Sequence, residues 1–251
     1  TMDNFKKIYH SKLITAAQVA DLIVSDSDII VAQCASEPQG CMSHFHMAGN
    51  RVTDVKVFSV LTLKPYPFYM LPEMKGHFEL CSWFHAPGSR QALKEKTGTV
   101  TYVPNMLHRA ASDRLRVRRP HLFVGTCTPP DEEGYVSLSL GLTYERDILE
   151  AAEISVLEVN SFLPYTYGDT RIHISEVDYF VEHHQVPPTL PAPVLDETAM
   201  QLGKHIADLV EDGSTIQLGI GEIPNAVALM LKDKKDLGVH TEMYVDAFVD
   251  L

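Results

Sequence analysis

The stretch Gln217-Leu-Gly-Ile-Gly-Glu-Ile-Pro-Asn-Ala-Val227 reads as a strand that ends in a glycine turn, followed by the start of a helix. A glycine turn lets backbone N–H groups approach a ligand closely, and the helix start adds partial positive charge. A second strand follows and delivers Glu242. Because open α/β sheets bind ligands at the carboxyl ends of their strands, we expect Glu242 to face the turn. The stretch therefore predicts a site for a phosphate or an oxyanion beside a carboxylate.

A dinucleotide-binding fingerprint is one interpretation of this turn. The strand, Gly219-x-Gly221, the helix and an acidic residue about twenty positions further on match half of that fingerprint. The fingerprint also needs glycine or alanine three positions after the second glycine, so that helix and strand pack closely, and this chain has Pro224 there. The proline argues against dinucleotide binding.

A covalent role for Glu242 is the second interpretation. An ionised carboxylate can attack an activated carbonyl when N–H donors stabilise the tetrahedral oxyanion, and one such donor is typically worth ~3 kcal/mol. The N–H groups of Ile220 and Gly221 could be those donors. A solvated structural glutamate at a strand end explains the same residue, and the physical argument alone leaves both interpretations open.

The composition of the 251 residues is that of a soluble globular protein, with 45% hydrophobic residues and a formal net charge of -12. The negative charge argues against a nucleic-acid surface. No apolar run is long enough to span a bilayer, and the first residues lead into no signal-peptide core, so we expect a cytoplasmic protein without membrane contact. The four cysteines are widely and irregularly spaced, and we expect them to be reduced and mostly buried.

Short apolar runs alternate with helix-like segments along the chain, which predicts an α/β fold with a mainly parallel sheet. The expected strands are 29–34, 55–61, 99–103, 121–126 and 154–159, and the expected helices are 15–24 and 143–152.

Four prolines within residues 186–194 predict a stiff linker between an N-terminal domain, 1–185, and a second α/β unit, 195–251. In the second unit we expect helices at 196–209 and 224–231 and strands at 215–219 and 239–244. Two strands and two helices are too few to close a core, so the second domain is expected to be incomplete in this chain.

The stretch from Gln217 to Val227, followed by Gly238-Val-His-Thr-Glu-Met, resembles the second-domain opening of the acetyl-CoA hydrolase/transferase family, and within it the 4-hydroxybutyrate and butyryl-CoA:acetate CoA-transferases. Thr128-Pro-Pro-Asp-Glu-Glu-Gly-Tyr-Val-Ser-Leu-Ser139 and Glu158-Val-Asn-Ser-Phe-Leu-Pro-Tyr-Thr-Tyr-Gly168 are similar to first-domain motifs of that family. The resemblance extends over nearly the whole chain. Members of the family are much longer, so we expect this chain to be a fragment or one chain of a split enzyme that does not turn over alone.

The resemblance implies two related open α/β domains with the active site in the cleft between them. It matches Glu242 to the catalytic glutamate, which forms an acyl-glutamyl anhydride and then a glutamyl-CoA thioester in a ping-pong reaction. It matches the set Gly219, Ile220, Gly221, Glu222 and Ile223 to the turn that contacts CoA and the oxyanion. Coenzyme A is then a substrate that is attached covalently during the reaction, and no permanently bound cofactor or metal is expected.

Several other residues have both a functional and a simpler structural interpretation. Ser36, Glu37, Gln39 and Gly40 follow the first strand and could line an acyl or CoA pocket, with more weight on Gln39 and Gly40. Ordinary turn chemistry explains them about equally well. Gln217 is a further pocket candidate. His240 could orient Glu242 from the same strand face, although packing in the core is favoured.

The histidines at 44, 46, 183 and 184 are expected to be structural or at the surface, because no complete ligand set accompanies them. The basic run 114–119 could contact a CoA phosphate, but a solvated face is favoured. Cys34 is not expected to be a nucleophile, because no nearby group is evident that would lower its pKa.

The leading hypothesis is an acyl-CoA:carboxylate CoA-transferase that acts on acyl-CoA and short-chain carboxylic acids of the acetate, butyrate or 4-hydroxybutyrate type. We expect a homo-oligomer that needs the remainder of its C-terminal domain. An acyl-CoA hydrolase is the alternative within enzymes, and a non-catalytic binding or assembly module is the alternative outside them.

Overall fold

The computed structural model describes residues 2–96 and 99–251; residues 1, 97 and 98, which fall in the predicted first domain, lie outside the described residues. The chain divides into two compact units, unit 1 up to Pro188 and unit 2 from Thr189. This division falls inside the proline-rich segment, in which the structure has no helix or strand between Glu182 and Glu197.

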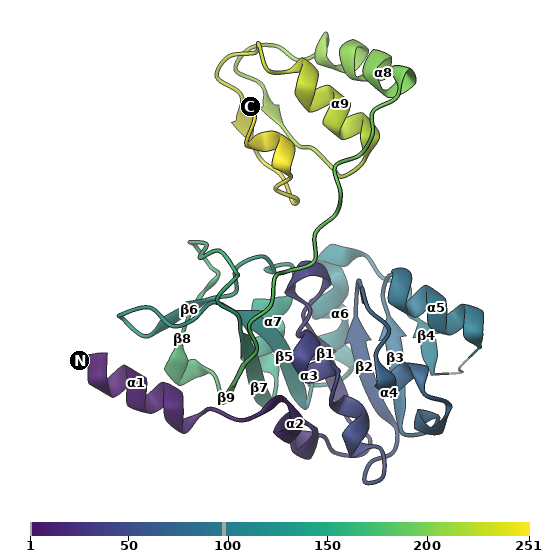
Figure 1. The fold of residues 1–251 in the computed structure, drawn as a ribbon, viewed down its shortest axis with the longest axis vertical. Coiled ribbons are helices and arrows are strands. Elements are labelled where there is room, and N and C mark those ends of the chain that lie inside the picture. The colour runs from purple at the N-terminus through teal and green to yellow at the C-terminus, as the bar shows by residue number, and fades with distance from the viewer. Residues whose placement is uncertain (1, 97–98) are drawn as a thin grey trace. The chain divides into compact units, whose positions relative to one another are not determined.

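Unit 1 is built on a seven-stranded sheet in which every neighbouring pair of strands is parallel. The predicted open α/β fold with a parallel sheet is confirmed. Helices lie on both faces of the sheet (Figure 1), which is why strands such as β5 are buried along their whole length. In spatial order the strands are β4 (Val100–Tyr102), β3 (Phe78–Ser82), β2 (Val55–Ser59), β1 (Asp28–Val31), β5 (Leu122–Cys127), β7 (Ile154–Val159) and β9 (Tyr179–Glu182).

The strand order places a topological switch point between β1 and β5. From β1 the chain proceeds outward through β2 and β3 to β4, whereas β5, β7 and β9 extend in the opposite direction. The loops that leave the carboxyl ends of β1 and β5 therefore diverge, and open α/β sheets bind their ligands in such a crevice. The side chain of Thr126 near the end of β5 donates to the carbonyl of Ser36 after β1, at 3.1 Å, and joins β5 to the loop after β1.

Two apolar clusters, one on each face of the sheet, form the core of unit 1. Along β1, Ile29 belongs to one cluster and Ile30 to the other, as alternating side chains of a doubly covered strand require. The first cluster includes the aromatic ring of Phe68, and the second includes those of Phe123 and Tyr144.

The helices of unit 1 connect these strands. Thr15 caps the predicted helix 15–24 with a capping box to Gln18, but only Ala16–Val19 is α-helical and Ala20–Leu22 continues as a 3-10 turn. Tyr135–Ser137 (β6) and Arg171–His173 (β8) form a separate antiparallel pair. The helices are α1 (Met2–Ser11), α2 (Ala16–Val19), α3 (Gln39–Met42), α4 (Pro67–Met70), α5 (Pro87–Glu95), α6 (Ala110–Val117) and α7 (Glu145–Ala151). Of the helices in residues 2–96 and 99–251, none has the length and apolar character that crossing a membrane requires.

Unit 2 contains α8 (Glu197–Ala207), β10 (Thr215–Ile216), α9 (Glu222–Met230) and β11 (Gly238–Val239), with the two strands parallel. Its small core is formed by Leu218, Val227, Leu231 and Phe248, together with Ala207 and Ala228. Asp196 caps α8 by accepting a hydrogen bond from the N–H of Ala199 at 2.7 Å.

Both strands of unit 2 are shorter than predicted. The expected ranges 215–219 and 239–244 are strand only at Thr215–Ile216 and Gly238–Val239, because each strand has only the other as a partner. Helix α9 begins at Glu222 rather than at Pro224, so the proline occupies the third helical position. That two related α/β domains are present, with the second incomplete, stays a prediction.

Candidate active site

The glycine turn of unit 2 connects β10 to α9. Gly221 has φ +131° and ψ 179°, a backbone conformation that essentially only glycine adopts without strain, and it is the N-cap of α9. The Nδ2 of Asn225 donates to the carbonyl of Gly221 at 2.7 Å and so fixes the turn against the first turn of the helix. The remaining predicted members of this turn, Gly219, Ile220, Glu222 and Ile223, are exposed. The turn is accessible to a ligand and is held by a local hydrogen bond.

Glu242 lies at the same edge of the two-stranded sheet as the turn. The N–H of His240 donates to the carbonyl of Ile216 at 3.1 Å, and this bond continues the pairing of β11 with β10 past the last strand residues. The hydroxyl of Thr241 then reaches the carbonyl of Leu218 at 3.4 Å. These two contacts place the residue before Glu242 beside the residue before Gly219. The Glu242 side chain is exposed and thus free to meet a substrate.

His240 and Gln217 are also exposed near this edge. The packed position that we favoured for His240 is wrong, because β11 ends at Val239 and the histidine side chain is at the surface. The argument that His240 and Glu242 share one strand face fails for the same reason. His240 is therefore an exposed residue directly after β11.

In unit 1 the predicted pocket residues Gln39 and Gly40 begin α3, in the loop that leaves the carboxyl end of β1. Both are buried, and the Nζ of Lys64 donates to the Oε1 of Gln39. Gly40 is packed so closely that a Cβ there would lie 2.8 Å from Cγ of His183 and 3.0 Å from Oε2 of Glu158. Only glycine fits at this position, which identifies the start of α3 as a tightly constrained corner of the crevice.

A buried carboxylate holds this corner in place. Glu158, in β7, accepts the backbone N–H of Gly40 at 3.3 Å and that of Cys41 at 2.8 Å. Burial raises the pKa of Glu158, while the two backbone hydrogen bonds and the nearby His183 act in the opposite direction. Glu158 belongs to a sequence motif noted above, but no residue pattern reveals that its partner is the loop after β1.

Glu37 is a second buried carboxyl group in the same loop and is 3% exposed. Its Oε2 accepts from the hydroxyl of Tyr66 at 2.8 Å, and its Oε1 accepts from the N–H of Leu63 at 3.3 Å. Burial raises the pKa of Glu37 to about 8; the two hydrogen bonds and Lys64 lower it, and the negative charge of Glu158 raises it. Glu37 is therefore neutral at pH 7 for most of the time.

The stability of unit 1 is expected to fall as the pH rises from about 5 to about 8. The folded-state pKa of Glu37 lies above its ordinary value of 4.5. The stability linked to this proton is therefore fully present below pH 4.5 and is lost as the pH passes through 8. The variant Glu37→Gln mimics the neutral acid, and we expect its unfolding free energy to depend less on pH over this range. Urea denaturation at pH 5, 6.5 and 8 measures the difference, and equal pH dependence in both proteins would contradict the assignment.

The other candidates have structural roles. All four cysteines are free; Cys34 is half-buried, and burial raises the pKa of its thiol, which agrees with the expectation that it is not a nucleophile. The Nδ1 of His44 bonds the carbonyl of Gly40 at 2.7 Å, and Nδ1 of His184 accepts from the N–H of Ser161 at 3.0 Å. Within residues 2–96 and 99–251, no group of three or more His, Cys, Asp or Glu side chains is placed to hold a metal ion.

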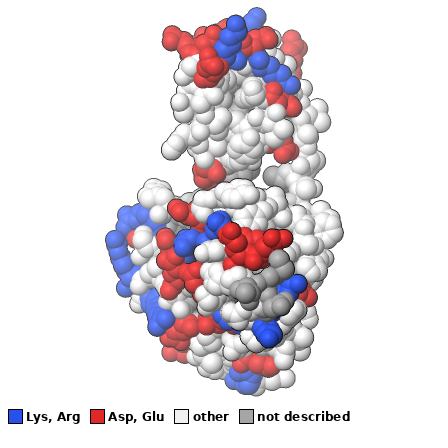
Figure 2. All heavy atoms as spheres, turned by 90° about the vertical axis from the view of Figure 1, so that its left-hand side faces the viewer, with Lys and Arg blue, Asp and Glu red and all other residues white. Residues whose placement is uncertain are grey.

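The arginines of the basic run 114–119 form ion pairs and a ring contact within unit 1. Arg114 pairs with Asp28 at the start of β1 and stacks on the ring of Phe58, and Arg118 pairs with Asp26 at 3.1 Å. The two ion pairs lie at the amino end of β1, opposite the crevice edge. Figure 2 shows both acidic and basic side chains on the visible face of unit 1.

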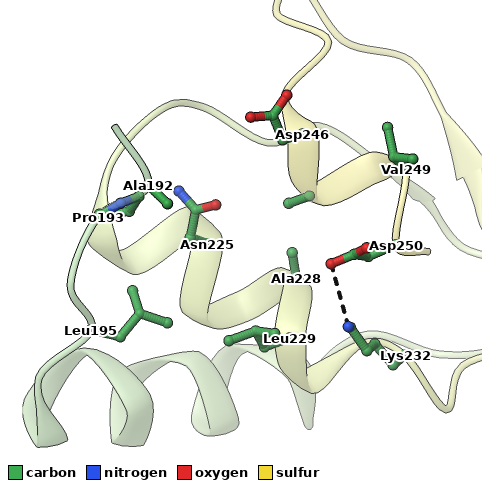
Figure 3. A pocket seen from close by; sticks show the side chains of 11 residues that line it. Ala192, Pro193, Leu195, Asn225, Ala228, Leu229, Lys232, Asp246, Val249 and Asp250 are labelled. Atoms are coloured by element: carbon green, nitrogen blue, oxygen red, sulfur yellow. Dashed lines mark hydrogen bonds and ion pairs between the residues drawn. The ribbon is translucent and has the colours of Figure 1, made fainter. Parts of the chain in front are cut away.

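A cavity of about 520 Å³ opens in unit 2 against one face of α9. Its lining is largely apolar, and its charged pair, Lys232 and Asp250, is 3.4 Å apart (Figure 3). None of the residues of the glycine turn lines it, and neither does Glu242. The cavity contains no paired nucleophile and base, so the glycine turn and Glu242 remain the better candidate for chemistry.

Comparison with known proteins places these features in context. The model of the acetyl-CoA hydrolase/transferase N-terminal domain matches residues 2–191. The 4-hydroxybutyrate coenzyme A transferase of Clostridium kluyveri is 31% identical over 98% of this chain and 57% of its own length, and the butyryl-CoA:acetate CoA-transferase of Anaerostipes caccae is 30% identical over 99% and 57%. The crystal structure of RipA from Yersinia pestis superposes with a TM-score of 0.91 at 31% identity and covers 98% of this chain and 59% of that protein. The chain thus spans somewhat more than half the length of these relatives.

Proposed function

The chain belongs to the acetyl-CoA hydrolase/transferase family, and from this premise we propose that it is part of an acyl-CoA:carboxylate CoA-transferase in which Glu242 is the nucleophile. The glycine turn and Glu242 at adjacent strand ends are the observation that carries this proposal. The two curated relatives named above are CoA-transferases for 4-hydroxybutyrate and for butyryl-CoA with acetate, which supports short-chain carboxylic acids as the substrates.

The chemistry requires a nucleophile and an oxyanion site. A carboxylate oxygen of Glu242 attacks the thioester carbonyl, and the resulting oxyanion accepts hydrogen bonds from N–H groups of the turn at Ile220 and Gly221. The CoA thiolate then leaves, which produces an acyl-glutamyl anhydride. Attack of this thiolate on the glutamyl carbonyl releases the first carboxylic acid and forms a glutamyl-CoA thioester. An incoming carboxylate repeats these steps in reverse order, so the thioester bond is conserved without ATP.

The exposed Glu222 occupies the first position of α9, where a carboxylate interacts favourably with the positive charge of the helix N-terminus.

Transfer and hydrolysis are distinguished by their need for an acceptor acid. The full-length protein that carries this chain is incubated with butyryl-CoA, with and without acetate, and acetyl-CoA and free CoA are quantified. We expect acetyl-CoA to form only with acetate and little free CoA in either reaction. Release of free CoA without acetate would instead indicate an acyl-CoA hydrolase, and no loss of butyryl-CoA in either reaction would indicate a non-catalytic module. We also propose that turnover depends on the part of the second domain that the longer relatives carry, and that the enzyme is a homo-oligomer.

A further inference from the structure

The side-chain amide of Gln39 is oriented by a cation. Lysine has three N–H donors and no acceptor, so the Gln39 oxygen must face the Nζ of Lys64. The amide nitrogen of Gln39 then points away from Lys64 with its two N–H bonds. Lys64 belongs to the loop after β2 and is exposed, whereas Gln39 lies in the loop after β1 and is 4% exposed. The contact therefore links two loops at the carboxyl edge of the sheet.

Glu37 forms the second link between these loops. It accepts hydrogen bonds from Leu63 and Tyr66, which flank Lys64 in the loop after β2. The hydroxyl of Tyr69 donates to the carbonyl of Lys64, so the lysine backbone is also fixed from α4. With its neighbours on both sides and its own carbonyl held, Lys64 presents Nζ from a restricted backbone position.

The charges around Glu37 set the pH at which its carboxyl group ionises, and this ionisation determines whether the link between the two loops stays intact. Lys64 favours the ionised carboxyl group and Glu158 disfavours it, while the hydroxyl of Tyr66 donates directly to it. Burial raises the pKa of the Cys34 thiol and of the Tyr69 and Tyr144 hydroxyls, and the negative charge of Glu37 raises each of them further. A second negative charge beside Glu158 in this buried corner is unfavourable, so ionisation of Glu37 is expected to loosen the corner.

We propose that Lys64 and Glu37 are positioning residues that fix the amide of Gln39 as a hydrogen-bond donor to a carbonyl or carboxylate oxygen of the substrate. This inference deepens the proposed CoA-transferase function and rests on it. Lys64 sets which end of the amide faces the substrate, and Glu37 holds the loop that carries Lys64. Glu37 and Gln39 follow β1 beside the switch point of the sheet, where open α/β folds bind their ligands, and Lys64 contacts them from the loop after β2.

The test uses the full-length protein with butyryl-CoA and acetate and measures kcat/KM from pH 6 to 9.5. In Lys64→Met the Gln39 amide loses the hydrogen bond that orients it. We expect kcat/KM at pH 7 to fall about tenfold, as the loss of one oriented hydrogen bond predicts. The matched control is Lys75→Met, since Lys75 is an exposed lysine in the turn before β3. The control separates the loss of a positive charge from the loss of the contact.

The pH profile separates positioning from a purely structural role. We expect kcat/KM of the wild-type protein to decline as the pH rises through about 8, the range in which Glu37 ionises. Glu37→Gln has no carboxyl group to ionise at this position, so its kcat/KM should lack this decline. Lys64→Met should move the decline to higher pH, because the positive charge that favours ionisation of Glu37 is gone.

Each outcome distinguishes the inference from the proposed function. If the wild-type protein transfers CoA while Lys64→Met matches Lys75→Met, or while Glu37→Gln declines with pH as the wild type does, the positioning roles are overturned and the transferase assignment stands. If the wild-type protein transfers no CoA to acetate, the proposed function is overturned and this inference with it.

Discussion

Replacement of Glu242 by glutamine is expected to lower the rate of acyl transfer on the order of 10³-fold or more, because an amide cannot replace the attacking carboxylate in a covalent mechanism. The side chain is exposed, so the unfolding free energy should change by less than about 0.5 kcal/mol. Steady-state kinetics with butyryl-CoA and acetate, together with urea denaturation, measure both quantities in the full-length protein.

Glu211→Gln is the matched control for this variant. Glu211 is an exposed glutamate of unit 2 between α8 and β10. Its replacement by glutamine removes the same charge elsewhere in the same unit. We expect it to retain wild-type kinetics. If Glu242→Gln kept more than about a tenth of the wild-type rate, the substitution would raise the activation free energy by less than about 1.4 kcal/mol. Glu242 would then not be the nucleophile.

Replacement of Gly221 by alanine is expected to lower kcat about 10²-fold, because the turn that carries the oxyanion donors must change its shape. With φ +131° and ψ 179°, Gly221 lies in a region of backbone conformation that alanine occupies only at a cost of about 1 to 3 kcal/mol. There is room for the added methyl group, since its nearest neighbour would be Cδ of Pro224 at 3.9 Å. The backbone conformation and not a steric clash therefore decides the effect.

Gly213→Ala provides the comparison for Gly221→Ala. Gly213 also has a positive φ, +76°, and open space around its Cα, but it precedes β10 and lies outside the glycine turn. Both variants should lose stability, and only Gly221→Ala should lose kcat. Similar kinetic losses in the two variants would show that general destabilisation of unit 2 causes the effect.

The sequence predicted the central strands of unit 1 well because their signals are local. The strand at Ile154–Val159 was predicted with its observed bounds, and the apolar runs at β1, β2 and β5 were located within a few residues. No strand is predicted at β3, Phe78–Ser82, or at β9, Tyr179–Glu182, which are only five and four residues long and offer short apolar runs. They are strands because a neighbouring parallel strand pairs with each one.

In unit 2 the opposite holds, because the predicted strands are longer than the observed ones. Residues beyond Ile216 and Val239 have strand-like composition, but the strands end there, and one further bond from the N–H of His240 to the carbonyl of Ile216 precedes the turn of the chain toward Gly219 and Glu242. The early end of the strands exposes both segments at one edge, which is what the proposed chemistry requires. The apolar pattern could not predict where pairing would stop, because that depends on which partners a strand has.

For the corner of unit 1 around Gln39, the sequence predicts the position of the loop but not the hydrogen bonds that hold it. The sequence indicated that the loop after β1 faces a crevice, and the structure places that loop at the switch point. The hydrogen bonds from Glu158, Lys64 and Tyr66 join segments that are far apart in the chain, and no periodic pattern encodes such contacts. The nearby buried glycine, Gly40, was the only local signal that something packs closely there.

The measurement that tests the role of Glu242 most directly is the mass of its peptide after reaction with acyl-CoA. The full-length protein is incubated with butyryl-CoA without an acceptor acid, quenched in acid, digested, and analysed by mass spectrometry. We expect CoA attached to the peptide that contains Glu242, and loss of this label when acetate is added before quenching. An unlabelled Glu242 peptide from protein that actively transfers CoA would contradict the account, because the carboxylate would then not form the covalent intermediate.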